Sequence, residues 1–381
     1  MKTLFNTFPT GIIVSAVPHL LKSLNKSVMR NRFIFLFTIL TVLSCKQDIY
    51  SSLSYEVPNF KDSVTTKATV INDTIYTRGS FKIFSYKDYL ILFTPMDEYV
   101  FQLFNKETGQ WIKNFGEVGR GPDQVLKLFD SSLNEEEGIL TSFSQGPKEI
   151  CVFYLDSVIH DKKHFLDKIS LKKYDKMTFN HAYKCKNGFL LESGKCEVYP
   201  ESRRFSLFSE KGELTATYDQ YPFNSRPASD SINNSLDWNY LRPKKTFSPN
   251  GSKLAEASEI GGILQILHIG KSIEPHAIKG FYKPHFAMKD HHVEFTSQTR
   301  LWTFSVSSSN HYIYVLPHKS NTFYDQTYSQ DILVFDWEGN PVRKYKTDQN
   351  IVAVCADEEK EKLYILSHTP GQSQNLCFIH L

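Results

Sequence analysis

A glycine-rich stretch, FGEVGRGPDQ at residues 115–124, is the first candidate for chemistry in this sequence. Phosphate-binding loops of the form G-x-G-x-x-G connect a strand to a helix, so that backbone amides face the anion. Here the order is G-x-x-G-x-G, proline follows at once, no Gly-Lys-Ser/Thr is present, and the next run, VLKLFD, is typical of a strand. The stretch therefore predicts a tight connection between strands, built on Gly116, Gly119, Gly121 and Pro122. Arg120 within it is a candidate ligand contact if its side chain faces a channel.

Histidines and acids supply two further candidates. KPHFAMKDHHVEF contains imidazoles and carboxylates that suit a metal ion, namely His285, Asp290, His291, His292 and Glu294. Adjacent residues on a strand point to opposite faces, so His291 and His292 cannot both ligate from one regular strand, and the pattern favours a surface loop. The acidic runs at 135–137 and 357–359 lie in turn-like settings and predict solvated hairpin ends. No G-x-S-x-G, HExxH, EF-hand or CxxC motif occurs.

The segment MRNRFIFLFTILTVLSCKQD, residues 29–48, resembles the signal of a bacterial lipoprotein. It has a basic start, an apolar run from Phe33 to Leu43, and Ser44 before Cys45. A run of about eleven apolar residues is too short to span a bilayer of about 30 Å but fits a secretory signal. We expect cleavage after Ser44 and lipid on Cys45; an uncleaved anchor or an ordinary buried helix is the alternative. Residues 1–28 are then an over-long start upstream of Met29, or part of a long leader.

Charge and cysteine content narrow the partners and the location. The formal net charge is +3, but all five charged residues before Cys45 are basic, so the remaining chain is slightly acidic. It lacks the basic excess that drives nucleic-acid binding. Export permits disulfides, and only Cys185 and Cys196 are close enough in sequence to suggest one; buried free thiols are the alternative for all the later cysteines.

After a polar tether at 45–63, the chain consists of short apolar runs separated by turns, as in all-β folds. Three longer stretches share one pattern: 101–115, 205–218 and 332–345 each have an alternating run ending in Phe, a turn with Gly, and a second alternating run. Each predicts a hairpin whose glycine takes a positive φ.

These hairpins, each preceded by an inner pair of runs, describe four-stranded units that divide residues 64–381 into six blades of a β-propeller. We expect units to begin near Phe81, Phe129, Thr178, Lys244, Leu301 and Asn350. The last unit supplies only three strands, and TTKATVINDTIYT at 65–77 is expected to add the fourth, which would close the ring and remove two exposed edges.

The lipoprotein signal, the six units and the G-x-x-G-x-G-P loop together resemble the TolB-like six-bladed propeller lipoproteins of bacteria. Members often continue Gly-Pro-Gly-Glu, where this chain has Gly121-Pro122-Asp123-Gln124. The resemblance implies a fold and a place in the cell envelope, attached to a membrane through lipid, and no catalytic residues. We expect a module that binds a glycan, a peptide or a partner protein. The alternative is a hydrolase or lyase with a divalent metal on the propeller axis, held by carboxylates from different blades.

Overall fold

The fold is that of a computed structural model, which describes residues 53–75, 82–126, 128–193, 201–220, 241–285, 287–289, 292–319, 328–368 and 373–381. All of these belong to one compact unit, Ser52–Leu381. The predicted signal at 29–44, the lipidation site Cys45 and the leader at 1–28 lie outside the described residues. None of the helices that the described ranges contain is long and apolar enough to cross a membrane.

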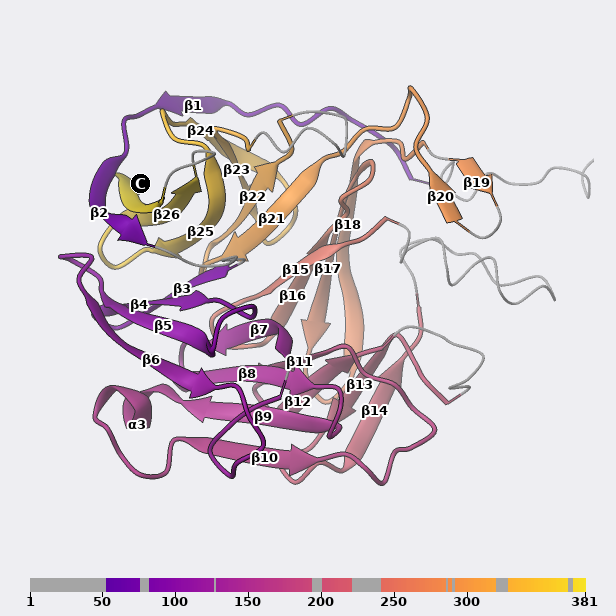
Figure 1. The fold of residues 1–381 in the computed structure, drawn as a ribbon. Helices are drawn as coiled ribbons and strands as arrows, with labels where there is room; N and C mark the ends of the chain where they lie inside the picture. The colour runs from indigo at the N-terminus through magenta and orange to yellow at the C-terminus, as the bar shows by residue number, and fades with distance from the viewer. Residues whose placement is uncertain are drawn as a thin grey trace, which may run out of the picture. The chain divides into compact units, whose positions relative to one another are not determined.

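This unit is a six-bladed β-propeller of antiparallel sheets (Figure 1), as the sequence predicts. The first blade contains β3 (Lys82–Tyr86), β4 (Tyr89–Phe93), β5 (Tyr99–Asn105) and β6 (Trp111–Glu117). The second contains β7 (Leu128–Asn134), β8 (Ile139–Ser144), β9 (Glu149–Tyr154) and β10 (Leu166–Ser170), with the short helix α3 (Leu155–Ile159) between its last two strands. The third contains β11 (His181–Cys185), β12 (Gly188–Glu192), β13 (Phe205–Phe208) and β14 (Leu214–Tyr218).

The other three blades complete the ring. The fourth contains β15 (Lys244–Phe247), β16 (Lys253–Ala257), β17 (Gly262–Ile269) and β18 (Ile273–Tyr282). The fifth contains β21 (Thr303–Ser308), β22 (Tyr312–Pro317), β23 (Asp331–Asp336) and β24 (Pro341–Lys346). The sixth contains β25 (Ile351–Asp357), β26 (Lys362–His368) and β27 (Gln374–His380). A separate two-stranded sheet pairs β19 (Ala287–Lys289) with β20 (His292–Glu294).

The predicted hairpins and unit boundaries are confirmed. The three repeated stretches form the outer pairs β5–β6, β13–β14 and β23–β24. Their turn glycines Gly109, Gly212 and Gly339 have φ values of +67°, +73° and +78°, a region that glycine enters without steric cost. The six inner strands begin at Lys82, Leu128, His181, Lys244, Thr303 and Ile351, each within a few residues of the predicted start.

The sixth blade takes its outer strand from the other end of the chain. β2 (Thr69–Ile75) pairs antiparallel with β27, for example Thr69 with Phe378, and this agrees with the strand expected from residues 65–77. The sequence did not indicate a second N-terminal strand. β1 (Asp62–Thr65) adds to the outer edge of the fifth blade, parallel to β24, and Arg343 holds Asp62 at 2.5 Å.

Part of the predicted tether also contacts the propeller. Of residues 45–63, the structure describes 53–63. Tyr55 forms an isolated bridge with Gly280 of β18, and the Phe60 ring meets that of Phe335 edge-on at 5.5 Å. These contacts place residues 53–63 along the fourth and fifth blades.

Aromatic side chains pack the spaces between blades. Between the first and second blades, Phe101 stacks on Phe115 at 4.9 Å and meets Phe153 edge-on at 5.2 Å, and all three are buried. Offset and edge-to-face pairs of this kind stabilise a core beyond the area that they bury. The core is therefore a series of layers between neighbouring sheets, which fixes the inner strands around a common axis.

Candidate functional site

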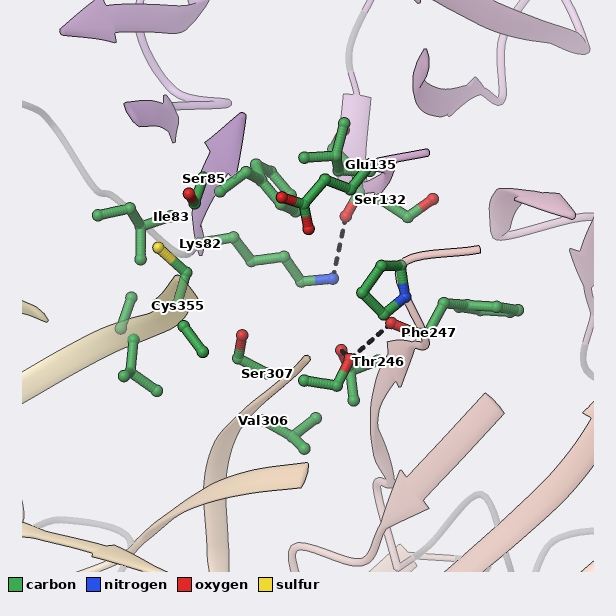
Figure 2. Close-up of a pocket in the computed structure, with 18 of the residues that line it drawn as sticks. Lys82, Ile83, Ser85, Ser132, Glu135, Thr246, Phe247, Val306, Ser307 and Cys355 are labelled. Carbon is green, nitrogen blue, oxygen red and sulfur yellow. Dashed lines mark hydrogen bonds between the residues drawn. The ribbon is translucent and has the colours of Figure 1, made fainter. Parts of the chain in front are cut away.

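The central channel is lined by all six inner strands (Figure 2). Its walls carry mostly small side chains, and seven of them bear hydroxyls: Ser85, Ser131, Ser132, Thr246, Ser305, Ser307 and Ser308. The cavity has a volume of about 70 Å³. A water molecule occupies about 30 Å³ in the liquid, and sites for small organic ligands hold about 300–1,000 Å³. The channel interior accommodates water, and a larger ligand has to bind at one of its ends.

Hydroxyls on the channel wall differ in their hydrogen bonding. Ser308 donates to the carbonyl of Phe247 at 2.5 Å and lies 2.9 Å from the Thr246 hydroxyl. The hydroxyls of Ser85 and Ser132 are buried, and none of the residues that the structure describes forms a hydrogen bond with either one. Buried polar groups normally find a partner, and an ordered water is the usual one when the protein offers none. The channel is therefore polar inside.

Charged side chains gather where the inner strands begin, an end that we call the mouth. Lys82 of β3 contacts Asp130 of β7 at 2.6 Å and also donates to the carbonyl of Ser131 at 3.1 Å. On the far side of Asp130, the Nδ1 atom of His181 lies 3.6 Å from its carboxylate. Burial alone would raise the pKa of Asp130, but Lys82 and His181 more than offset this and lower it. Asp130 is thus held ionised between two blades.

The third and fourth blades continue this network at the mouth. Lys245 of β15 contacts Glu192 of β12 at 2.8 Å, and Arg204 forms a buried ion pair with Glu256 and donates to Gln265 at 2.9 Å. Burial opposes ionisation of Glu192, but Lys245, His181 and Arg204 together lower its pKa. The mouth therefore carries carboxylates that are each matched by a cation.

Two of the polar atoms at this end that lack a hydrogen-bond partner among the described residues lie next to the contacts of Asp130 and Lys245. They are Nδ1 of His181 and Oε2 of Glu192, and both are buried at the atom level. At 3.6 Å, the distance from His181 to Asp130 is longer than a hydrogen bond. The His181 side chain as a whole keeps 28 % of its surface exposed, so its ring is accessible to a ligand although these two atoms are covered.

The opposite end of the channel, which we call the base, carries Glu135. This residue follows β7 and lines the cavity. Burial raises the pKa of Glu135 to about 7; Lys106 opposes the increase, and the negative charges of Asp357, Glu359 and Glu358 add to it. A carboxylic acid with such a pKa can exchange a proton near neutral pH.

The acidic runs are only in part the solvated hairpin ends that their sequence predicts. Asp357 is buried and holds the equally buried Lys106 at 2.7 Å, which links the sixth blade to the first. Glu137 contacts Lys184 at 2.9 Å, and Glu358 contacts Ser309 at 2.6 Å. A turn at the base of a propeller faces its neighbours as well as solvent, and the sequence pattern alone does not reveal those neighbours.

The glycine-rich stretch connects β6 of the first blade to β7 of the second, and Gln124 organises it. The Gln124 side chain accepts from the amide of Gly121 at 2.9 Å and donates to Glu117 at 2.9 Å. A Cβ atom on Gly119 would overlap the Gln124 amide. Lys168 of β10 donates to the Gly121 carbonyl at 3.1 Å and fastens the loop, which includes Pro122, to the second blade.

Gly116 and Arg120 occupy different settings in the same stretch. Gly116 is buried with φ of +71°, and a Cβ there would lie 2.7 Å from Val100. Arg120 is exposed and does not line the channel cavity. A contact between Arg120 and a ligand remains a proposal that would have to involve the outer surface of the loop.

The predicted metal and cysteine sites have the following positions. His291 and Asp290 lie outside the described residues, and the described ranges contain no group of three or more His, Cys, Asp or Glu residues placed to hold a metal ion. Cys196 also lies outside them, whereas Cys151, Cys185, Cys355 and Cys377 are buried and free. Burial raises the pKa of the Cys151 and Cys185 thiols to about 12, so both stay protonated at neutral pH.

Sequence reasoning missed the charged residues of the mouth. Four of them lie near the starts of inner strands: Lys82, Asp130, His181 and Lys245. Each stands alone in its own sequence segment, and a charged residue beside a strand is ordinary. The signal, a charged side chain within the first three residues of successive inner strands, becomes visible only once the blade repeat is known.

The fold and site thus define a closed six-bladed propeller with a narrow polar channel and a charged mouth. The sequence matches the family described as TolB-like 6-blade propeller-like over residues 59–359, and the chain belongs to this family. No curated protein matches it.

Two solved structures align with most of this chain. A member of the DUF4221 family from Bacteroides vulgatus ATCC 8482 aligns with a TM-score of 0.51 at 9 % identity, covering 83 % of this chain and 96 % of that one. A protein from Bacteroides fragilis NCTC 9343, whose name proposes that it is exported, aligns with a TM-score of 0.48 at 11 % identity, covering 86 % and 94 %. At 9 % identity, the first alignment shows a shared fold and says nothing about activity.

Proposed function

We propose that this chain is a lipid-anchored β-propeller of the cell envelope that binds a glycan, a peptide or a partner protein at the mouth of its channel. The observation that carries the proposal is the pair of polar atoms there, Nδ1 of His181 and Oε2 of Glu192, for which the described part of the chain offers no hydrogen-bond partner. An ionised carboxylate only accepts hydrogen bonds, whereas an imidazole donates or accepts. Together they suit a ligand with hydroxyl or amide groups, which sugars and peptides both provide.

The exposure of the mouth supports this role. Lys82, Asp130 and His181 keep 23 %, 19 % and 28 % of their side-chain surface in contact with solvent, whereas Arg204 and Glu256 keep 4 % and 0 %. The exposed group is available to a ligand, and the buried pair behind it holds the surrounding strands in place. Paired charges at a rim favour specificity over affinity, because each contact has to replace an existing one.

The test is binding of the purified full chain to glycan and peptide arrays, with histidine variants at the two ends of the propeller. His181→Ala removes the imidazole at the mouth. His311→Ala is the matched control, because His311 is exposed at the base, where it contacts Glu358 at 2.9 Å. We expect His181→Ala to weaken binding about tenfold and His311→Ala to leave it unchanged. Equal binding by both variants, or no binding on either array, would refute the proposal.

One observation favours the alternative, a hydrolase or lyase with an axial divalent metal. Glu135, with a pKa of about 7, lies at the base end of the channel beside Asp357 and Glu358. Calorimetric titration of the full chain with Ca²⁺, Mg²⁺, Mn²⁺ and Zn²⁺ distinguishes the two proposals. If one of these ions bound with 1:1 stoichiometry and Glu135→Gln abolished that binding, the enzyme proposal would be favoured over the binding-module proposal.

A further inference from the structure

A second hollow lies on the mouth face, away from the channel, at the border of the fourth and fifth blades. We call it the basic groove; its volume is about 800 Å³, within the range of sites for small organic ligands. Its walls come from the N-terminal segment, the end of β18, the residues before β21, and the mouth ends of β22, β23 and β24. Because the channel itself holds about 70 Å³, this groove is the larger of the two spaces by far.

Positive charge is in excess in the groove. Its walls carry Arg300, Lys319, Lys344 and Lys346, and the only carboxylate that faces them is Asp331, among the described residues. Asp331 is already paired with Lys344 at 2.8 Å. The described contacts give no carboxylate partner to Arg300, Lys319 or Lys346. Three cations around one concave space attract an anion, and its walls reduce the screening by water.

The guanidinium of Arg300 is held in an orientation that suits binding of a planar anionic group. Its guanidinium lies 3.5 Å from the centre of the Tyr282 ring, which holds it by cation–π attraction. Stacking covers the face of the guanidinium and leaves the N–H groups at its edge able to donate. Two parallel N–H groups match the two oxygens of a carboxylate, so a stacked arginine binds that group with defined orientation.

The remaining walls are aromatic and polar in a way that suits a sugar ring. Phe60 and Tyr282 are partly exposed there, and flat rings pack against the apolar face of a pyranose. Trp302, which also lines the groove, is buried, and its indole N–H has no hydrogen-bond partner in the described ranges. Ser63 and Gln330 add side chains that can bond hydroxyls. The single helix among the described residues, α3, belongs to the second blade. The dipole of a described helix therefore does not add to the positive charge of the groove, which comes from side chains.

We propose that the basic groove binds an acidic oligosaccharide, with a uronate carboxylate held by Arg300 and its neighbouring lysines. The proposal extends the binding function to a second site and does not depend on the contacts at the channel mouth. Phosphate shares the negative charge of a uronate but lacks the sugar ring, so it serves as the competing ligand in the test.

The experiment measures binding of a galacturonate trisaccharide and a glucuronate-containing tetrasaccharide to the full chain by calorimetry. The fully methyl-esterified galacturonate trisaccharide is the neutral control ligand. In the protein, the double variant Lys319→Gln/Lys346→Gln removes two exposed cations that make no described side-chain contact. Lys271→Gln is the control variant, because Lys271 is exposed in the β17–β18 turn at the base.

We expect at least one acidic oligosaccharide to bind, the methyl ester to bind at least tenfold more weakly, and the double variant to lose about tenfold in affinity. Binding should weaken as salt is raised, because surface charges are screened, and Lys271→Gln should behave as wild type. The proposal would be overturned if neither acidic oligosaccharide bound, or if the methyl ester bound with equal affinity. It would also be overturned if the double variant kept the wild-type affinity, or if inorganic phosphate competed for the site as strongly as the oligosaccharide. Loss of oligosaccharide binding in His181→Ala alone would place the ligand at the channel mouth, so the two proposals fail separately.

Discussion

At the scale of single residues, Glu135 has a higher pKa than its position in the sequence suggests. Its three-residue acidic run predicts ordinary ionised side chains, yet burial and the nearby Asp357, Glu359 and Glu358 raise its pKa from 4.5 to about 7. A carboxyl whose pKa is higher in the folded chain binds more protons there than in the unfolded chain. Folding is therefore favoured most below pH 4.5, and this contribution decreases as the pH rises toward 7.

We expect Glu135→Gln to be more stable than wild type at pH 8 and no more stable at pH 4. Although the surroundings of its carboxyl raise the pKa, Glu135 as a whole residue stays more than a third exposed, so screening keeps the gain at pH 8 to about 1 kcal/mol or less. Urea unfolding at both pH values measures the difference, and Glu136→Gln, at an exposed neighbouring residue, is the control. A Glu135→Gln variant that gains nothing at pH 8 would contradict the elevated pKa.

The buried pair of Lys106 and Asp357 gives a second prediction at this scale. Lys106→Met leaves the Asp357 carboxylate buried without its partner, which costs about 3–5 kcal/mol in comparable cases. We expect a loss of that size in the free energy of unfolding, measured by chemical denaturation. Adding Asp357→Leu to Lys106→Met should recover part of it.

Lys87→Met is the matched control for this pair. Lys87 contacts Asp156 at 2.6 Å, also at the base, but both side chains are more than half exposed. We expect no measurable change in stability, because exposed ion pairs contribute little. Equal effects of the two lysine substitutions would show that burial does not decide the strength of these pairs.

At the scale of elements, the glycine-rich connection is a structural device. Its glycines leave room for the Gln124 side chain, which supplies the hydrogen bonds that the loop lacks. We expect Gly119→Ala to displace the flexible end of the Gln124 side chain and to cost about 1–3 kcal/mol in stability, mainly from the two hydrogen bonds that Gln124 then loses and less from the overlap itself. Gly146→Ala should be neutral, because a Cβ there meets nothing within 4 Å.

Denaturant midpoints of the two glycine variants measure this difference. The double variant Gly119→Ala/Gln124→Ala separates the two causes, because it removes the overlap as well as the side-chain bonds. We expect it to recover the cost of overlap only. If Gly119→Ala and Gly146→Ala were equally stable, Gln124 would not be what requires glycine at position 119.

At the scale of the whole molecule, strands from the N-terminal and C-terminal parts of the propeller meet in the last blade. β2 completes the sheet of β25, β26 and β27, and Lys106 and Asp357 join the first and sixth blades at the base. A closed ring has no open sheet edge between its first and last blades. The described N-terminal segment also borders the basic groove, through Pro58, Phe60 and Ser63.

Anchoring is tested on the intact protein. We expect Cys45→Ala to abolish lipid attachment and to leave the unprocessed precursor, because lipid is added to the cysteine thiol before cleavage after Ser44. Metabolic labelling with a radioactive fatty acid and electrophoretic mobility measure the two effects. Cys377→Ala is the control, as Cys377 is buried in the propeller. Labelling that persists in Cys45→Ala, or processing to the same size, would refute the lipoprotein signal.

The sequence alone determined the repeat, the boundaries of the blades and the need for a strand from the N-terminus. These follow from local rules: alternating apolar residues form strands, a glycine with positive φ closes each hairpin, and a last unit with three strands requires a fourth. The sequence did not predict that β1 extends the fifth blade, because strand pairing between distant segments has no local signature. That pairing was visible only in the structure.

Only the tertiary structure decided where the chemistry lies. Lys82, Asp130 and His181 come from three blades, and each is an unremarkable charged residue in its own segment. Arg300 and Lys346 likewise stand far apart in sequence but line one groove. Charges act through distances of a few ångströms, and in a propeller those distances are set by the packing of one blade against the next. The local pattern therefore determines the blades, and their closure into a ring determines the sites.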